Sequence, residues 1–542
     1  MAIRVSGLNS GLDTDSIVQE LVSAYSQKTE KYEKAQTKLG WKQEIWKNLN
    51  TKVNTFYKSL DKVRFSGGYN TKKTTCSDTV KATVSANSGA VTGTQKLHIL
   101  STAQAGYLTG GKISLGKAVT KGDGSTGYEP LDGKVASGTK MSELGYDGGD
   151  TTIKLSTKDG NGKDVTTDIN ITGDTTINEV VSQLKDAGLN ASFDSGNGRI
   201  FLSAKSTGAN SNFTLEPADS TDENAKKALG FLGLDTSVSE YGDQATKIEG
   251  SDATIVLNNV VYTNSSNNFS INGLSIAVNG VTEDVDDVME NGKINVSKLN
   301  ADKAITITTS TDTQGIYDKI KDFLTDYNNI INEMTKLYNA DSAGTYEPLT
   351  DDEKDEMSDT EIEKWETKIK DSLLRRDSSL STIMSAMTSA MSKSININGK
   401  DYALSSFGIK TLGSLNSAKN EQNAYHIDGD EDDENSSSNE DKLMAAITED
   451  PDTVVEFMTQ LSSGLYKAID DQMKSTTLRS KYCIYNDKEL DTQYNNYTKT
   501  IKEWEQKVSD KEEYYYKKFS AMETALSNIQ SQTNSLTGLL GS

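Results

Sequence analysis

The sequence predicts a multidomain α+β protein: long terminal helices that form an antiparallel coiled coil, a helix-rich leg domain and inserted antiparallel β head domains. Three observations carry this prediction. Apolar residues recur at steps of three and four near both ends of the chain. The middle is rich in Gly, Thr, Ser and Asn, with short alternating runs typical of strands. The helical period then returns from Thr311.

The length and net charge of the chain limit the classes of function that it can have. A chain of 542 residues has room for three or four domains. Its net charge of -22 argues against a nucleic-acid partner and against an anionic membrane, because both attract clustered Lys and Arg. We find neither a long apolar run for membrane insertion nor a secretory signal at the first residues. Two histidines and two cysteines leave little for a metal site or a catalytic centre.

The amino-terminal helix is predicted by a stripe of apolar residues that only Lys28 and Lys42 interrupt. A polar residue at such a position either selects register or extends its charged end into water, and the sequence favours neither. The stripe contains Val18, Leu21, Tyr25, Tyr32, Leu39, Trp46, Leu49, Val53, Phe56 and Leu60.

The carboxyl-terminal helix carries a second stripe of nearly the same length, so the two helices can pair antiparallel. Such a pair still leaves apolar area uncovered, and we expect other copies of the chain to cover it. The alternative is a helical bundle within one chain that buries both stripes. The second stripe contains Ile501, Trp504, Val508, Tyr515, Phe519, Met522, Leu526, Ile529 and Leu536.

Strands are predicted between residues 66 and 310, for example at Gln95 to Leu100 and Ala253 to Leu257, and a capped helix at Thr176 to Ala187. From Thr311 a wide apolar helical face suits a bundle core. Further helices are predicted at Ile362 to Leu374, at Leu380 to Met391 and after Asp450. The leg-domain core is predicted to contain Phe323, Tyr327, Trp365, Leu373, Leu374 and Leu461.

We expect four nested domains, each but the innermost built from two separate stretches of chain. The predicted ranges are 1–70 with 486–542 for the terminal coiled coil, 71–105 with 311–485 for the leg, 106–128 with 245–310 for the β head, and 129–244 for the inserted outer β head.

Four segments resemble the flagellar hook-associated protein 2 family, the filament caps. They are SGLNSGLDTDSIVQELV from Ser6, the acidic stretch from Tyr346 to Met387 with Trp365 and an LLR-D motif, ITEDPDTVVEFM from Ile447, and KFSAMETALSNIQSQTNSL from Lys518. A further stretch, Thr172 to Gly208, resembles a motif found across flagellins and hook-associated proteins. The resemblance therefore spans the chain.

The resemblance implies a non-enzymatic structural cap at the tip of the bacterial flagellum, which retains exported flagellin and promotes its folding and insertion. It implies a homo-oligomer of four to six copies, contacts with flagellin and hook-filament junction proteins, a cytoplasmic export chaperone on the carboxyl-terminal helix, export by the flagellar type III apparatus and, in some members, adhesion to mucin. The alternatives are flagellin or a junction protein, or a surface adhesin whose β domains bind glycans.

Several polar residues are candidates for a catalytic or metal-binding role, but the pattern around each of them argues against it. We therefore expect no catalytic residue, cofactor or metal. The acidic insertion from Asp428 to Asp441 spaces carboxylates as a calcium loop does, but lacks its Gly and final Glu, which favours a solvated loop. His98 and His426 lack a neighbouring nucleophile. Cys76 and Cys483 form a candidate disulfide at one end of the helix pair, with two free thiols as the alternative.

Overall fold

The computed structural model describes residues 10–124, 126–158, 162–413 and 415–540. These residues form two compact units. One takes the described parts of Met1–Asn70 and Thr313–Ser542, and the other is Thr71–Asp312. The first unit is mainly helical and the second is mainly antiparallel sheet, which confirms the predicted α+β class.

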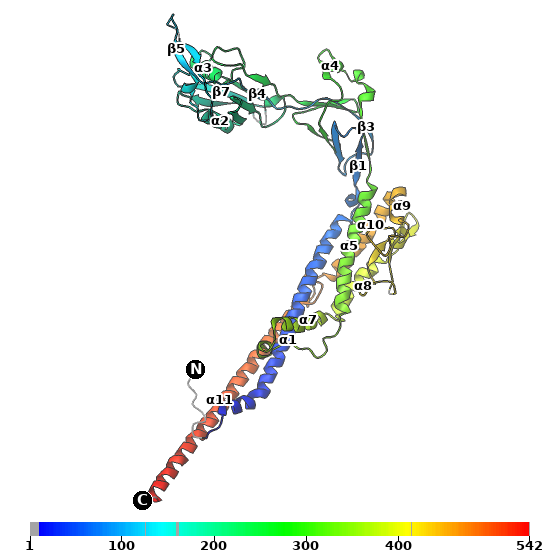
Figure 1. Cartoon of the computed structure of the whole chain (residues 1–542). Helices are drawn as coiled ribbons and strands as arrows, with labels where there is room; N and C mark the ends of the chain where they lie inside the picture. The colour runs from blue at the N-terminus through cyan, green and yellow to red at the C-terminus, as the bar shows by residue number, and fades with distance from the viewer. Residues whose placement is uncertain (1–9, 125, 159–161, 414, 541–542) are drawn as a thin grey trace. The chain divides into compact units, whose positions relative to one another are not determined.

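The helical unit is built on long helices, two of which are the predicted terminal helices (Figure 1). The long helices are α1 (Thr14–Ser59), α5 (Thr313–Tyr338), α8 (Ser378–Met391), α10 (Pro451–Gln472) and α11 (Asp487–Leu540). The other elements are η1 (Leu60–Lys62), η2 (Ser66–Tyr69), α6 (Asp351–Asp355), α7 (Asp359–Ser372), α9 (Lys442–Glu449), β20 (Ile395–Ile397), β21 (Lys400–Tyr402), η7 (Leu404–Phe407), β22 (Ile409–Thr411) and β23 (Tyr425–Ile427).

One apolar core holds these helices together. It joins the second half of α1 to α5, α8 and α10, and Trp46, Tyr327 and Phe457 are fully buried in it. Local sequence fixes the helix starts. Asp377 caps α8 by accepting bonds from the backbone N–H groups of Ser379 and Leu380. Asp450 caps α10, with Pro451 in the first turn as predicted.

The second unit contains a β sandwich and an outer part with its own core. In the sandwich, the sheet β1-β19-β3-β13-β14 packs on the sheet β15-β16-β2 through a shared apolar core. The strands are β1 (Lys72–Cys76), β2 (Ala82–Ala86), β3 (Gly93–Ser101), β13 (Ala253–Leu257), β14 (Val260–Asn264), β15 (Asn268–Ile271), β16 (Leu274–Val278) and β19 (Ile305–Thr311).

A short segment covers the other face of the five-stranded sheet, where Leu100, Val256 and Val288 form a small apolar cluster. The segment contains α4 (Val285–Val288), β17 (Met289–Glu290), β18 (Lys293–Ile294), η5 (Val296–Lys298) and η6 (Ala301–Lys303).

The outer part has a separate core between two sheets, β12-β4-β10-β9 and β11-β7-β8, and helix α2. Thr176 caps α2, as one of the two threonines that the sequence offers, and forms a capping box with Glu179. The elements are β4 (Tyr107–Thr109), β5 (Gly116–Thr120), β6 (Thr126–Pro130), η3 (Met141–Leu144), β7 (Thr151–Lys158), β8 (Asp164–Ile171), α2 (Ile177–Asp186), β9 (Asn190–Asp194), β10 (Arg199–Ser203), η4 (Ala209–Ser211), β11 (Thr214–Pro217), α3 (Glu223–Phe231) and β12 (Thr246–Ile248).

Two features of the fold differ from the expected arrangement. Strands β1 and β3, which the sequence placed with the leg helices, lie in the β unit because they pair with β19 and β13. The second half of α1, placed in a separate coiled coil, shares one core with the leg helices. Both differences arise because burial partners far along the chain, rather than local pattern, decide which core a segment joins.

Candidate assembly site

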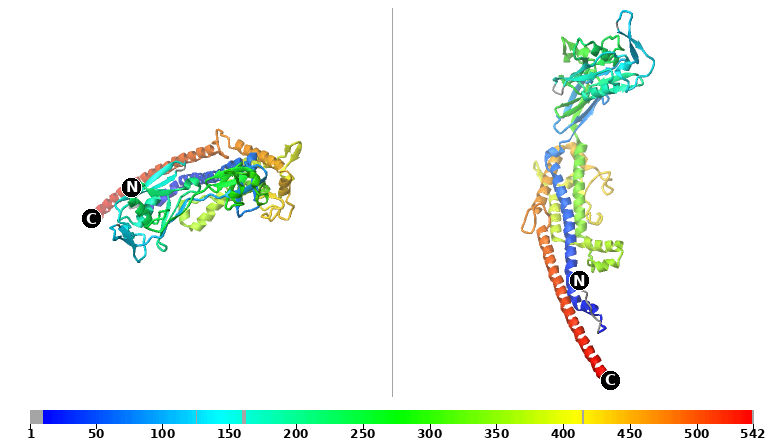
Figure 2. Two further views of the ribbon diagram at one scale, coloured as in Figure 1. Left: turned by 90° about the horizontal axis from the view of Figure 1, so that it is seen from above. Right: turned by 90° about the vertical axis from the view of Figure 1, so that its left-hand side faces the viewer.

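The two terminal helices lie side by side and antiparallel, as both figures of the chain show (Figures 1 and 2). Ring contacts fix the register. The ring centroids of Tyr25 and Trp504 lie 6.3 Å apart. Those of Trp46 and Tyr485 lie 5.1 Å apart in a stacked arrangement. Tyr32 contacts Tyr497, again at 6.3 Å. Because partner numbers fall along α11 from Trp504 to Tyr497 as they rise along α1 from Tyr25 to Tyr32, the helices run in opposite directions.

Polar side chains between the aromatic pairs reinforce the same register. The side-chain amide of Gln36 donates to the Thr498 hydroxyl at 2.5 Å. The amide of Gln43 donates to Asp491 at 2.8 Å, and that of Asn54 to the Tyr482 carbonyl at 2.9 Å. Directional bonds of this kind resist sliding of one helix past the other.

The half of the pair nearer the bundle is fully covered within one chain. Its predicted stripe residues are between 0% and 4% exposed and belong to the bundle core. They are Trp46, Leu49, Val53, Phe56 and Leu60. The single-chain alternative raised from the sequence therefore describes this half.

The other half, which we call the distal half, is only partly covered. Leu21 is 43% exposed, Ile529 58% and Leu536 59%. Val18, Leu39 and Ile501 are buried. The remaining predicted stripe residues are half-buried, namely Tyr25, Tyr32, Trp504, Val508, Tyr515, Phe519, Met522 and Leu526.

Helix α11 also continues past the point where α1 begins. Ser10, just before α1, bonds to Glu523 through its backbone N–H and its hydroxyl. From Glu523 the helix runs on to Leu540. Ile529 and Leu536 therefore lie on a stretch that α1 does not reach, which explains their exposure.

The structure places Val22 and Thr29 in the contact stripe, at 3% and 8% exposed, although the sequence pointed to Leu21 and Lys28. A straight α-helix has 3.6 residues per turn, so its buried face drifts away from a strict seven-residue repeat. Counting at 3.6 would have found both residues.

Both lysines that interrupt the stripe have partners. The Lys28 ammonium lies 4.6 Å from the centroid of the Trp504 ring. The Lys42 ammonium pairs at 2.8 Å with Asp377, the residue that caps α8. Lys28 thus joins the two terminal helices, and Lys42 joins α1 to the bundle.

The distal half also carries like charges that face each other across the pair. Ser26, Thr29, Glu30 and Glu33 of α1, with Glu505, Val508, Ser509 and Glu512 of α11, line a groove of about 360 Å³. Burial and then the neighbouring Glu505 carboxylate raise the pKa of Glu33 above its ordinary value. This repulsion weakens pairing in the distal half at neutral pH.

The leg residues predicted from sequence divide into two groups. Phe323, Tyr327, Leu374 and Leu461 lie in the bundle core at 4% exposure or less. Leu373 is half-buried, outside the core. Trp365 also lies outside it, where its ring contacts Tyr346 at 4.4 Å and its N–H donates to the Glu347 carbonyl.

The two cysteines are free thiols, so the candidate disulfide is not formed. Cys76 belongs to β1 of the β unit and donates weakly to the carbonyls of Asp78 and Ala82. Cys483 is buried in the core of the helical unit, and burial raises the pKa of its thiol to about 11.

The acidic insertion is anchored to the helical unit at its start, where Asp428 and Asp430 are buried, while most of its later residues are exposed as a solvated loop would be. The Lys321 ammonium of α5 lies 2.7 Å from Asp430 and 2.6 Å from Asp432. Burial acts to lower the pKa of Lys321, but hydrogen bonds to both aspartates outweigh it and raise that pKa overall. Lys410 pairs with Asp428 at 2.6 Å. Lysine ammonium groups therefore occupy three of the carboxylates, Asp428, Asp430 and Asp432, that a calcium ion would need.

Within the described ranges, no group of three or more His, Cys, Asp or Glu side chains is placed so that it could hold a metal ion. His98 contacts Glu283 at 2.7 Å, but both are at most 6% exposed and are closed to a substrate. His426 contacts Asp433 at 2.6 Å within the folded insertion. The first pair joins segments 185 residues apart, and the second is local to the insertion.

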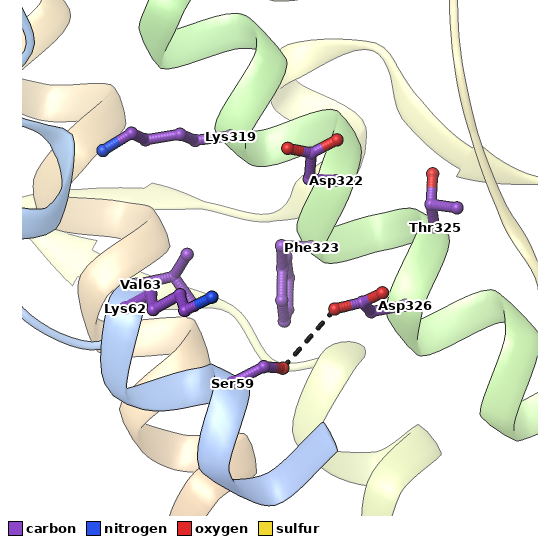
Figure 3. Close-up of a pocket in the computed structure, with 8 residues that line it drawn as sticks. All are labelled: Ser59, Lys62, Val63, Lys319, Asp322, Phe323, Thr325 and Asp326. Carbon is purple, nitrogen blue, oxygen red and sulfur yellow. Dashed lines mark hydrogen bonds between the residues drawn. The ribbon is translucent and has the colours of Figure 1, made fainter. Parts of the chain in front are cut away.

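A groove of about 420 Å³ lies between the end of α1 and α5 (Figure 3). Its floor is apolar, with Phe323 only 4% exposed, and its rim carries both lysines and aspartates. Ser59 donates to Asp326 at 3.4 Å across it. The two lysines and two aspartates of the rim balance each other's charge, and the lining contains neither histidine nor cysteine. The lining residues are Ser59, Lys62, Val63, Lys319, Asp322, Phe323, Thr325 and Asp326.

Among the helices that the described ranges contain, none combines the length and the apolar character needed to cross a membrane.

Comparison with known proteins matches both ends of the chain to one family. The model for the flagellar hook-associated protein 2 C-terminus matches residues 250–531, and that for its N-terminus matches residues 10–106. A flagellar hook-associated protein 2 from Halalkalibacterium halodurans is 22% identical over 88% of this chain and 83% of its own length. A B-type flagellar hook-associated protein 2 from Pseudomonas aeruginosa is 27% identical over 75% of this chain and 69% of its own length.

Solved structures give a weaker match. The D1-D2-D3 domains of the flagellar cap protein from Escherichia coli are 19% identical, with a TM-score of 0.44 over 79% of this chain and 97% of that chain.

Proposed function

The chain belongs to the flagellar hook-associated protein 2 family, and from that membership we propose that it is the structural cap at the distal end of the bacterial flagellar filament. In this role it retains exported flagellin and promotes its folding and insertion. The observation that carries the mechanism is the incompletely covered apolar stripe of the distal helix pair.

The distal half supports a homo-oligomer. Exposed apolar residues repeated along paired helices favour association with further helices of the same kind, and most soluble homo-oligomers have closed symmetry. We propose four to six copies, with the distal helices meeting neighbouring copies and the filament end. Contacts with hook-filament junction proteins and with an export chaperone on α11 belong to the same proposal, as does export by the flagellar type III apparatus.

A purely mechanical role, without catalysis, is part of this proposal. Its support is the chemistry of the histidines and cysteines described above: His98 is closed to solvent, His426 is held by Asp433, and burial of Cys483 favours the unreactive thiol. Adhesion of the β unit to mucin or other glycans stays a prediction from the family resemblance.

The proposal is tested in flagellated cells that carry only a variant gene. Replacing Leu21 and Ile529 together by aspartate places charge on the exposed stripe without touching the bundle core. We expect short or absent filaments and unpolymerised flagellin in the medium.

The matched control replaces Gln27 and Gln530 by aspartate, which are exposed positions on the same two helices outside the stripe. We expect filaments of normal length. Normal filaments from the Leu21→Asp, Ile529→Asp strain, with the variant present at wild-type level, would refute the proposal.

A further inference from the structure

An inserted arm, residues 340–372 with helices α6 and α7, lies along α1 and is held there mainly by charge. Lys34 and Lys38, one turn apart on α1, reach two carboxylates of the arm. The Lys34 ammonium lies 3.0 Å from Glu353, and the Lys38 ammonium lies 2.6 Å from Glu347. Lys42, one turn further, pairs with Asp377 at the root of the arm. Three lysines on one face are a local exception in a chain of net charge -22.

The arm has little apolar attachment to the bundle. Within α6 and α7 only Ile369 is a buried apolar residue, and it lies outside the bundle core. Pro348, just before α6, is the other buried apolar residue of the arm. One cation–π contact, from Lys370 of the arm to the ring of Trp41 on α1, adds to the ion pairs at 4.6 Å. The carboxylates of Glu353 and Glu347 are 49% and 56% exposed. Half-exposed ion pairs contribute little and weaken with salt, so the attachment is weak.

The arm can move without disturbing the bundle, because its two ends meet. The backbone N–H of Arg376 donates to the Tyr338 carbonyl at 3.0 Å, so the residues just before and just after the arm are hydrogen-bonded to each other. Leu374, directly after the arm, is fully buried in the core and anchors that end. Within the arm, Glu366 pairs with both Lys354 and Lys370.

From these observations we propose that the basic face of α1, formed by Lys34, Lys38 and Trp41, is a docking site for the acidic arm of a second copy of this chain. The inference rests on the proposed oligomer. Every copy carries both the basic face and the arm, so neighbouring copies are complementary by construction, and exchange of an identical element is a low-cost route to association. The chain's own arm occupies the site when no neighbour is present.

Charge reversal tests the exchange with full-length chains. One variant carries Lys34→Glu and Lys38→Glu, and a second carries Glu347→Lys and Glu353→Lys. Each alone opposes like charges, so hydrogen exchange of the α7 amides should become about tenfold faster than in the wild type. The α6 amides are left out, because Glu353 also caps that helix at Thr350.

Mixing the two variants distinguishes an arm that docks on its own chain from an arm that docks on a neighbouring copy. In the mixture, opposite charges meet only between different copies, so an arm on a neighbour restores slow exchange, to within about twofold of the wild type. A chain with all four substitutions should be restored by itself. A Lys47→Glu chain, altered at an exposed lysine of α1 outside this face, should exchange as the wild type does.

Two results would overturn the proposal. One is unchanged amide exchange in each two-substitution variant measured alone. The other is fast exchange that persists in the mixture although the chain with all four substitutions exchanges as slowly as the wild type. Sedimentation of the wild type is run alongside. If the wild type is oligomeric but the mixture does not restore slow amide exchange, only the exchange of arms between copies is refuted. If the wild type stays monomeric at every concentration, the oligomer itself is refuted.

Discussion

The two halves of the terminal helix pair carry the same apolar repeat but differ in how far that repeat is buried. Near the bundle, Trp46 and Val53 are at most 1% exposed, because α5, α8 and α10 surround them. In the distal half, Leu21 and Ile529 are 43% and 58% exposed. A periodic stripe therefore establishes that a helix buries one face, and the surrounding chain decides whether that burial is complete in one copy.

The largest expected difference between the halves is in folding stability. Trp46→Ala removes a buried ring stacked on Tyr485 and should lower the free energy of unfolding by about 3–5 kcal/mol. Leu21→Ala, in the distal half, should cost less than about 1 kcal/mol. Chemical denaturation below the association concentration measures both. Equal losses would mean that the two halves are covered alike.

Association should show the opposite pattern. Leu21→Asp with Ile529→Asp should raise the dissociation constant of the oligomer at least tenfold, since about 1.4 kcal/mol of lost apolar contact suffices. The unfolding midpoint of the dilute protein should stay unchanged. Sedimentation velocity across a concentration series measures the constant, with Gln27→Asp and Gln530→Asp as the control of equal charge.

Loss of a helix cap should also destabilise the half near the bundle more than the distal half. Asp377 caps α8 and pairs with Lys42, so Asp377→Ala should cost about 1–2 kcal/mol in thermal or denaturant unfolding. Asp13 caps α1 at its distal end through Ser16. Asp13→Ala should leave the global transition in place and fray only the first turn, which amide exchange detects.

The smallest expected effect is the pH dependence of the distal half. Because the folded pKa of Glu33 is raised, chiefly by burial and then by Glu505, the folded pair binds more protons than the unfolded chain between the unfolded and folded pKa values. Stability should rise as pH falls through the folded pKa of Glu33, and this gain is lost again as pH rises. Glu33→Gln should flatten the dependence, as measured by amide exchange along α1 and α11. A steeper loss of protection in acid would contradict the assignment.

Patterns with a strong local cause were predictable from the sequence. The cap of α2 at Thr176, the start of α10 at Asp450 and the strands around Leu97 and Ile255 all appear in the structure. The short hairpins β20–β21 and β22–β23 were missed, because strands of three residues give too few alternations to recognise.

What sequence could not supply was the partner of each side chain. Lys42 reads as an interruption of a stripe until Asp377 lies beside it, and the start of the acidic insertion reads as solvated until Lys321 is seen between its carboxylates. In the same way Trp365 reads as a core residue, although its ring contacts Tyr346 outside the core. Pairings between residues far apart in the chain depend on tertiary packing, which no local window contains.

The central claim is that other copies of the chain cover the exposed distal stripe, and thiol labelling tests it directly. Leu21→Cys, Ile529→Cys and the control Gln27→Cys are made one at a time in a Cys76→Ser, Cys483→Ala background. Labelling rates are then compared below and above the concentration at which the chain associates. We predict that association slows labelling at 21 and 529 at least about tenfold and leaves 27 unchanged. Equal rates at 21 and 529 in the associated and dissociated protein would contradict the claim.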